Sequence, residues 1–318
     1  NISRSRFYGL PLPFYVCEKC GKVHVIGSLE ELKKRATSPE LVDKLPNIHR
    51  PWIDDIKIKC DCGEEVSRVP DVGDVWLDAG ITPFSTKKYF TDKKFFEANF
   101  PSDYVCEMIE QIKLWFYSLL IMSVVLTGKA PYKKLVTYQY VKDEHGGEFH
   151  KSGGNSLEAD IVADKVGADV VRYLYSSSSP SNDMRFGFTL TDEARRKILA
   201  FWNIYTFFNT YACIDNPALE GFKPKSENLL VSDKWLIQSI NKFVENSDKN
   251  YADDKQFVVV RDFEKLVDDI SNFYIRSNRK RFWKSENKDD QLTAYWCLYS
   301  AIKAMIRVMA PIIPFVTE

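Results

Sequence analysis

The spacing of apolar residues changes at Thr191, and this change divides the chain into two kinds of structure. Before it, residues 103–128 predict a strand followed by a long helix, and residues 133–141 predict a buried strand rich in β-branched and aromatic side chains. A glycine-rich loop, 146–155, comes next, and two short helices separated at Gly167 follow it. This order of strands, loop and helices is typical of an α/β fold.

Long amphipathic helices are predicted after this point. The first has Thr191 as its N-cap and an apolar stripe at helical spacing, made of Ile198, Phe201, Tyr205 and Phe208. A linker over 216–231 leads to three more helices, at 232–247, 259–283 and 291–310. The last third of the chain therefore reads as a helical bundle.

The first 70 residues are rich in turns. Residues 28–36 predict a short helix with Ser28 as N-cap and Glu31 completing a capping box. The segments "VHVI" and "IKIKC" read as short strands, and "DVWLDAG" reads as a strand that enters a turn at Gly80.

Charge and hydropathy limit the partners. The 44 basic and 44 acidic side chains cancel, so any nucleic-acid binding must come from a local basic patch. The longest apolar run, Leu114 to Leu126, has 13 residues, whereas a bilayer needs about 20. We therefore expect a cytoplasmic protein without membrane contact. The chain lacks an initiator Met and ends on an apolar segment, so we expect it to be part of a longer protein.

Four of the seven cysteines form two close pairs, which predict a metal site. Cys17 and Cys20 have the C-x-x-C-G pattern of a zinc knuckle, and Cys60 and Cys62 give a second half as C-x-C-G. Four thiolates suit tetrahedral Zn²⁺ and leave no open position, so the site would be structural. The C-x-C half is one residue shorter than usual, and reduced, unliganded cysteines remain an alternative. His24 and His49 are possible substitute ligands.

The glycine-rich loop "GGEFHKSGGN" could bind an anion. Its backbone N–H groups precede a predicted helix, Lys151 adds a positive charge, and Ser152 and Asn155 can donate hydrogen bonds or cap the helix. The residue types alone leave a phosphate site and a plain turn equally open.

Several segments, in order, resemble those of one enzyme family. "HKSGGN" resembles the K-M-S-K-S-x-G-N loop of class I aminoacyl-tRNA synthetases, and "ISRSRFYGLPLPFY" resembles I-S-R-Q-R-Y-W-G-x-P-I-P of the isoleucyl, valyl and leucyl group. "RVPDVGDVWLDAG" and "FPSDYVCEMIEQIKLWFYSLL" are similar to two further segments of that group. "DDISNFYIRSNRKRFW" looks like a helix of isoleucyl enzymes, and "APIIPFVTE" like the close of an anticodon-binding helix.

The resemblance implies a fold and a domain order. We expect an α/β plus all-α chain: the second half of a class I synthetase Rossmann catalytic domain with a small zinc-binding insertion, followed by an α-helical anticodon-binding bundle. The expected domains are 1–70 for the zinc insertion, 71–188 for the catalytic half and its junction, and 189–318 for the bundle. The H-x-G-H segment and editing domain of the family are not in the sequence, so we expect these residues alone to be inactive.

The resemblance also assigns residues. Lys151 matches the second lysine of the family's loop and would steady the ATP phosphates, with Ser152 and His150 beside it as catalytic residues. Glu148 stands where the family has its first lysine. Glu107, Glu110 and Gln111 match groups that hold the adenylate, with Met108 and Leu114 as departures from the family pattern.

Two further sets follow from the same resemblance. Trp76 and Trp115 match tryptophans that line the amino-acid pocket, although plain core packing is an alternative. Arg276, Lys280 and Lys284 share one predicted helix face and would contact tRNA phosphates, although a solvated face is equally open.

The implied function is ATP-dependent activation of isoleucine and its transfer to tRNA by a monomeric ligase, with Mg²⁺ accompanying ATP and zinc as a structural metal. The alternatives are a valyl or leucyl enzyme and a non-catalytic, tRNA-binding relative. The second alternative draws on Glu148, His150, Met108 and Leu114, which depart together from the usual pattern.

Overall fold

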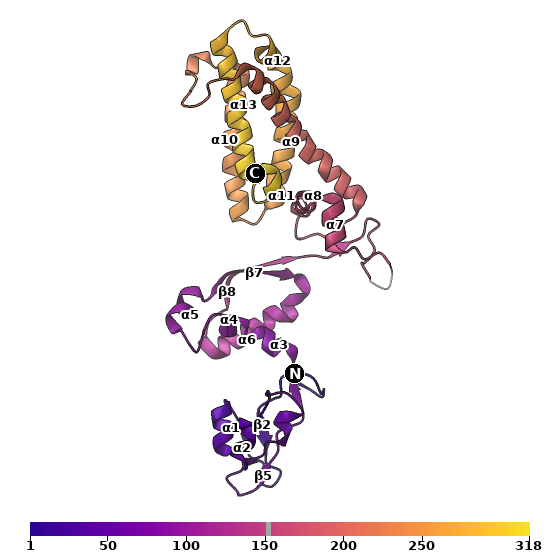
Figure 1. Cartoon of the computed structure of the whole chain (residues 1–318), viewed down its shortest axis with the longest axis vertical. Helices are drawn as coiled ribbons and strands as arrows, with labels where there is room; N and C mark the ends of the chain where they lie inside the picture. Colours follow the sequence, from indigo (N-terminus) through magenta and orange to yellow (C-terminus); the bar gives the residue numbers. More distant parts are fainter. Residues whose placement is uncertain (151–153) are drawn as a thin grey trace. The chain divides into compact units, whose positions relative to one another are not determined.

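The computed structural model describes residues 1–150 and 154–318, which form two compact units, Asn1–Thr137 and Tyr138–Glu318 (Figure 1). Most of the described strands have two or three residues and all pair in two-stranded sheets, whereas long helices dominate the second unit.

The first unit opens with a region that we call the cysteine module, residues 14–66. It consists of two antiparallel hairpins and three short helical segments: β2 (Phe14–Val16), β3 (Val23–Val25), α1 (Leu29–Arg35), α2 (Pro39–Asp43), η1 (Trp52–Asp55), β4 (Ile58–Lys59) and β5 (Glu65–Val66). Its small core packs Tyr15, Leu32 and Ile58 around the buried thiols of Cys17 and Cys60. The predicted strands and the Ser28 N-cap are confirmed, since the Ser28 side chain accepts a hydrogen bond from the Glu31 N–H.

The rest of the first unit is mixed α/β. Its elements are β1 (Ser3–Arg4), β6 (Val72–Gly73), α3 (Val75–Gly80), α4 (Thr82–Thr86), α5 (Lys93–Asn99), β7 (Ser102–Met108), η2 (Ile109–Lys113), α6 (Trp115–Thr127) and β8 (Tyr132–Tyr138). β1 pairs antiparallel with β6, and β7 pairs with β8.

The predicted strand over "DVWLDAG" is wrong, because this segment forms helix α3. The Asp74 carboxylate accepts a hydrogen bond from the Trp76 N–H at 2.8 Å and so caps the helix. Helix α3 packs closely on α6, and a Cβ on Gly80 would lie 2.8 Å from the Ser118 carbonyl oxygen. The glycine that we assigned to a turn is therefore needed for the close approach of two helices.

Helix α6 confirms the predicted strand-then-helix order and ends at Gly128, whose φ is +71°. The predicted strand over 133–141 forms as β8, but its side chains are exposed or half-buried, so the prediction of a buried strand is wrong. Among the described residues, one helical segment, Ile109–Thr127, is long and apolar enough to cross a membrane by length and composition alone, and 22% of it is buried. This segment is longer than the apolar run Leu114 to Leu126, because it also includes the 3-10 turn η2 that precedes α6.

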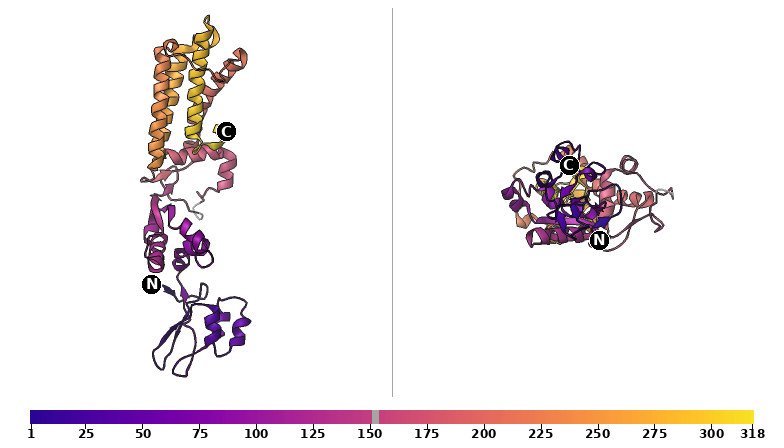
Figure 2. Two further views of the ribbon diagram at one scale, coloured as in Figure 1. Left: turned by 90° about the vertical axis from the view of Figure 1, so that its left-hand side faces the viewer. Right: turned by 90° about the horizontal axis from the view of Figure 1, so that it is seen from below.

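The second unit contains one short parallel strand pair and a set of helices. Its elements are β9 (Val141–Lys142), α7 (Ala159–Val166), α8 (Ala168–Ser177), β10 (Met184–Arg185), α9 (Phe188–Asp215), η4 (Ser226–Asn228), α10 (Val231–Ala252), α11 (Gln256–Asp269), η5 (Ile270–Ile275), α12 (Arg276–Trp283), α13 (Lys288–Met309) and α14 (Pro314–Thr317). Helix α10 packs against α11 and α13, and the long helices run alongside one another (Figure 2). The predicted helical bundle is confirmed, as is the break between α7 and α8 at Gly167.

Two details of the first bundle helix differ from the prediction. Helix α9 begins at Phe188 with Gly187 as its N-cap, and Thr191 is buried within its first turn, where its hydroxyl donates to the Phe188 carbonyl. Of the predicted stripe, Tyr205 is exposed, whereas Ile204 is buried. At 3.6 residues per turn the buried stripe drifts around a 28-residue helix, so a fixed spacing does not follow it.

A buried ion pair joins two helices of the bundle. Asp233 near the start of α10 is fully buried and accepts hydrogen bonds from Arg281 at 2.8 and 3.0 Å and from the Tyr274 hydroxyl at 2.7 Å. The π-helical segment η5 lies between α11 and α12 in a continuous helical run. Tyr274, on η5, and Arg281, on α12, are seven residues or about two helical turns apart, and both side chains reach Asp233.

Candidate functional site

The four paired cysteines lie on the turns of two hairpins. Cys17 and Cys20 occupy the turn between β2 and β3, and Cys60 and Cys62 occupy the turn between β4 and β5. Each turn requires a glycine with positive φ, at Gly21 (+72°) and Gly63 (+94°). The N–H of Gly21 donates to the Cys17 carbonyl, and that of Gly63 to the Cys60 carbonyl.

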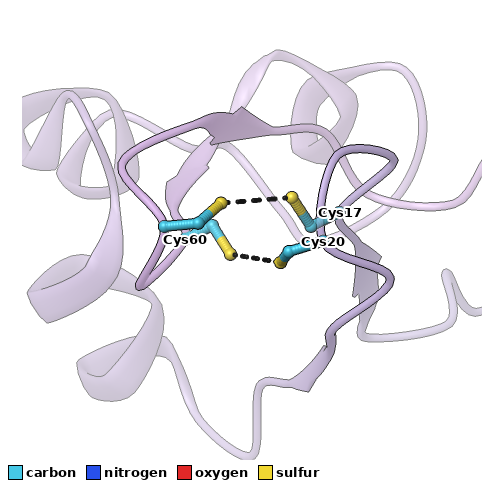
Figure 3. A group of neighbouring side chains, drawn as sticks. Cys17, Cys20 and Cys60 are labelled. Carbon is cyan, nitrogen blue, oxygen red and sulfur yellow. Dashed lines mark hydrogen bonds between the residues drawn. The ribbon is translucent and has the colours of Figure 1, made fainter.

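The two hairpin turns bring all four sulfurs together (Figure 3). Cys17 Sγ lies 3.6 Å from Cys62 Sγ, and Cys20 Sγ lies 3.6 Å from Cys60 Sγ. All four sulfurs lie within 4.8 Å of one another. Tetrahedral zinc with Zn–S bonds of about 2.3 Å would space its sulfurs by about 3.8 Å. The donor set therefore fits one Zn²⁺, and the shorter C-x-C half still places both of its thiols.

The thiol pKa values diverge within the cluster. The N–H of Cys20 lowers the pKa of Cys17 to about 7. The N–H of Cys62 also acts to lower the pKa of Cys60, but burial and the neighbouring cysteines raise it to about 12. Four adjacent thiolates repel one another, so all four ionise together only beside a cation.

The two histidines offered as substitute ligands differ in position. His24, on β3, is 3% exposed, and its Nε2 lies 3.2 Å from Cys60 Sγ. It is not one of the four residues whose ligand atoms meet at the candidate metal position. His49 is exposed and stacks on the Tyr8 ring. Within the described part of the chain, the cysteines therefore make the cluster by themselves.

The two predicted pocket tryptophans belong to the packed pair of helices α3 and α6. Trp76 follows the Asp74 cap, and both tryptophans are half-buried. Trp115 donates its indole N–H to the Ala79 carbonyl at 3.0 Å. This hydrogen bond and the close contact at Gly80 hold α3 against α6, so the packing of these two helices positions both indole rings.

Three predicted adenylate-binding residues lie where strand β7 ends. Glu107 is on the strand, and Glu110 and Gln111 are on η2, which follows immediately. The Gln111 side-chain oxygen accepts the Trp115 N–H at 3.2 Å, and a Glu107 carboxylate oxygen accepts the Met108 N–H at 3.0 Å. In α/β folds ligands bind at the carboxyl ends of strands, which is where these polar groups are placed.

The glycine-rich loop lies in the second unit. Lys151 and Ser152 lie outside the described residues, whereas His150 is exposed and its Nε2 is 3.3 Å from a Glu148 carboxylate oxygen. Asn155 binds the residues that precede the undescribed part of the loop. Its Oδ1 accepts the His150 N–H, and its Nδ2 donates to the Glu148 carbonyl and to the Asp143 carboxylate. Asn155 does not cap the helix that follows, which has Glu158 as its N-cap.

The predicted tRNA-binding residues are all exposed. Arg276 and Lys280 lie four residues apart on α12, and Lys284 is the C-cap of that helix. Lys284 Nζ lies 5.1 Å from the centre of the Trp283 ring. The nearby Arg281 is buried in the ion pair with Asp233, so the charges on this helix divide into a structural one and solvent-facing ones.

Comparison with known proteins places the chain. Residues 1–187, more than half of it, match the family "tRNA synthetases class I (I, L, M and V)", and residues 233–318 match "Anticodon-binding domain of tRNA ligase". The chain belongs to the class I tRNA synthetases. The fold agrees with this membership, as expected from the sequence, and the apolar segment 109–127 lies inside the region that matches the synthetase family.

Relatives of this synthetase family match over the full chain. This chain is 39% identical to the isoleucine--tRNA ligase of Thermus thermophilus and 36% identical to that of Methanocaldococcus jannaschii, each aligned over 326 residues. Both alignments cover all of this chain and 30% of the relative, so the chain spans about a third of the length of the curated relatives it matches.

Solved structures support the fold. A LeuRS from Agrobacterium radiobacter, in a ternary complex with tRNA and LeuAMS, matches with a TM-score of 0.70 at 17% identity, over 100% of this chain and 39% of that one. A methionyl-tRNA synthetase from Mycobacterium tuberculosis, in complex with methionyl-adenylate, matches with a TM-score of 0.68 at 16% identity, over 83% and 51%.

Two charged residues in the synthetase-like segments have structural partners that the sequence alone did not assign. Arg4 of "ISR" pairs with Asp74, the cap of α3. Arg68 of "RVPD" is buried, pairs with Asp54 and donates to the Leu12 and Asp71 carbonyls. Burial of a guanidinium requires such partners, but sequence spacing does not identify them.

Proposed function

We propose that the chain is part of an isoleucine--tRNA ligase, which activates isoleucine with ATP and transfers it to tRNA. The observation that carries the proposal is the match over the whole chain to isoleucine--tRNA ligases of bacteria and archaea, at 34–39% identity. The segment "DDISNFYIRSNRKRFW", similar to a helix of isoleucyl enzymes, supports the same amino acid.

The first reaction places a carboxylate of the amino acid against the α-phosphate of ATP, and pyrophosphate leaves. Positioning and charge stabilisation supply most of the catalysis in such a transfer. In our proposal, Lys151 stabilises the charge that develops on the leaving pyrophosphate, with Ser152 and His150 beside it. Mg²⁺ accompanies ATP as part of the substrate.

Glu107, Glu110 and Gln111 would bind the polar parts of the adenylate. Carboxylates suit an ammonium group and ribose hydroxyls as hydrogen-bond acceptors, and the Gln111 amide can both donate and accept. Trp76 and Trp115 would form flat walls for a branched aliphatic side chain. One methylene in such a pocket discriminates by only about 10- to 200-fold, so isoleucine selectivity also needs editing or other residues.

The cysteine module and the helical bundle would take no part in the chemical step itself. The cysteine cluster would hold a structural Zn²⁺, and Arg276, Lys280 and Lys284 would contact tRNA phosphates. We propose domains at 1–70, 71–188 and 189–318, a monomeric protein and a cytoplasmic location, as for a soluble enzyme of translation.

Isoleucine-dependent ATP–pyrophosphate exchange by the full-length protein tests the proposal. We expect exchange with isoleucine, weaker exchange with valine, and a loss of about 100-fold or more in Lys151→Ala, because that lysine acts on developing charge. The matched control is Lys223→Ala, which removes an exposed lysine of the linker and should leave exchange unchanged.

Two outcomes would redirect the proposal. Exchange that is faster with valine or leucine than with isoleucine would favour those branches of the group. No exchange with any branched amino acid, together with retained tRNA binding, would favour a non-catalytic relative, for which the Glu148 carboxylate beside His150 is the motivating observation.

A further inference from the structure

His24 is a buried histidine that the proposed function does not use. It lies in the middle of β3, paired across the hairpin with Tyr15, and is 3% exposed. Both of its ring nitrogens have partners: Nε2 lies 3.2 Å from Cys60 Sγ, and Nδ1 lies 2.7 Å from Arg35 Nη2. The side chain therefore joins the last turn of α1 to one cysteine of the cluster.

The partners determine where the imidazole carries its hydrogen. A guanidinium has only donors, so Arg35 donates and Nδ1 must accept. An imidazole whose Nδ1 accepts carries its hydrogen on Nε2, and Nε2 is therefore a donor. Cys60 Sγ must then be the acceptor of the Nε2–H, the role of a metal-bound thiolate. The carboxylates near Arg35 are farther away: Glu31 Oε1 lies 3.9 Å from Arg35 Nη1, and Asp61 Oδ1 lies 4.0 Å from Arg35 Nη2. His24 Nδ1 is therefore nearer to the guanidinium than either carboxylate.

The charges around the cluster indicate what the His24 hydrogen bond would do. Four thiolates around one divalent cation carry a net negative charge. The lysines on the hairpin turns, Lys19 and Lys22, are paired with Glu64 and Asp61, and these pairs are exposed. The Arg35 guanidinium, by contrast, polarises the imidazole and so directs positive character at Cys60 through a buried hydrogen bond.

We propose that His24 is a positioning residue of the cysteine cluster, which donates an Nε2–H hydrogen bond to the metal-bound Cys60 thiolate in an orientation set by Arg35. The inference rests on the zinc site proposed above. The hydrogen bond withdraws electron density from the sulfur, so Cys60 is less reactive toward electrophiles and its thiolate is oriented for the metal. Partners of this kind change metal affinity by about 10- to 100-fold when they are removed.

The first test uses the unaltered chain. Nitrogen-15 NMR of the zinc-loaded protein should show the His24 imidazole with hydrogen on Nε2 and a bare Nδ1. Replacement of zinc by cadmium-113 should show that the metal is bonded to four sulfurs. Hydrogen on Nδ1, or a direct cadmium–nitrogen bond to His24, would overturn the inference. A chain that binds no metal would overturn the zinc site itself, and the inference with it.

The second test uses variants with two readouts, zinc affinity against a chromogenic chelator and the rate of cysteine alkylation in the zinc-loaded protein. His24→Phe keeps a ring but removes the donor, and we expect affinity to fall about 10- to 100-fold and alkylation to accelerate. His24→Gln keeps an N–H group and should restore part of both. Arg35→Met should shift both readouts in the same direction by less.

The matched control is His49→Phe, which replaces the exposed histidine of the same unit and should change neither readout. Equal affinity and alkylation rate in wild type and His24→Phe would overturn the inference while leaving the zinc site in place. Loss of affinity in His24→Gln but not in His24→Phe, with unchanged alkylation in both, would show that the ring only fills space.

Discussion

The cysteine module and the helical bundle reach a folded state by different means. The module has strands of two or three residues and a small core, in which Cys17 and Cys60 are themselves buried members. The bundle has helices of 22 and 28 residues and an apolar core that continues across α7 to α13. A core that small cannot offset the conformational entropy of its loops without a cross-link, whereas the bundle can. The comparison teaches that the module depends on its cluster and the bundle on its packing.

Removal of one cysteine gives the largest expected effect. In small zinc domains the metal supplies about 10–16 kcal/mol of folding free energy, so Cys60→Ser should lose zinc and unfold residues 14–66. Metal analysis and limited proteolysis measure both results. Cys106→Ser, an exposed cysteine of the same unit outside the cluster, should keep one zinc per chain. A folded, protease-resistant module in Cys60→Ser would break the comparison.

The bundle has a different weak point, the buried ion pair of Asp233 with Arg281. Asp233→Ala removes the buried carboxylate and leaves Arg281 paired with the partly exposed Asp290, so it should cost up to about 3–5 kcal/mol, measured as a lower urea midpoint of the helical signal. Zinc content should not change. The control, Asp248→Ala, alters an exposed aspartate on the same helix and should stay within about 0.5 kcal/mol. Loss of zinc in Asp233→Ala would show that the two regions are coupled.

A smaller effect is expected at Asp54, which pairs with Arg68 beside the module core. Burial opposes ionisation, but hydrogen bonds from Arg68 and Arg50 hold the pKa of Asp54 below its usual value. Because the pKa of Asp54 is lower in the folded than in the unfolded chain, its ionised carboxylate stabilises the fold at neutral pH. This stabilisation is lost below about pH 4, as the pH falls through the lowered pKa. Asp54→Asn should cost about 1–3 kcal/mol at pH 7 and progressively less below pH 4.

Denaturant unfolding across this pH range measures the difference. The control is Asp43→Asn, whose carboxylate pairs with the exposed Lys33 and should contribute little. A difference between wild type and Asp54→Asn that persists unchanged at pH 3 would contradict the assigned cause.

The smallest effect concerns binding rather than stability. Lys280 is exposed on α12, so Lys280→Ala should leave unfolding and zinc content unchanged. In the full-length protein it should weaken tRNA binding and reduce the dependence of log affinity on log salt by about one. Lys242→Ala, an exposed lysine of α10, is the matched control. An unchanged salt dependence in Lys280→Ala would show that Lys280 does not contact tRNA phosphates and that this helix face is only solvated.

The sequence predicted elements well where a pattern was long or a turn had a specific chemistry. The bundle helices extend over many turns, and the C-G turns place the cysteines. Helix α3 was misread because its six residues are too few to distinguish periods, and its Asp74 cap resembles a strand end. The strand over 133–141 was expected to be buried, but β-branched residues indicate only a pleated conformation. The charged partner of Arg68, both partners of His24 and the arginine that pairs with Asp233 lie 11 to 48 residues away, at separations that no local pattern encodes.

Hydrogen exchange of the whole chain, with and without a zinc chelator, tests most directly whether the two regions are held together in these different ways. We predict that chelation accelerates backbone exchange strongly within residues 14–66 and leaves α9 to α13 unchanged. Unchanged exchange in residues 14–66, or equal acceleration in the module and the bundle, would contradict the account.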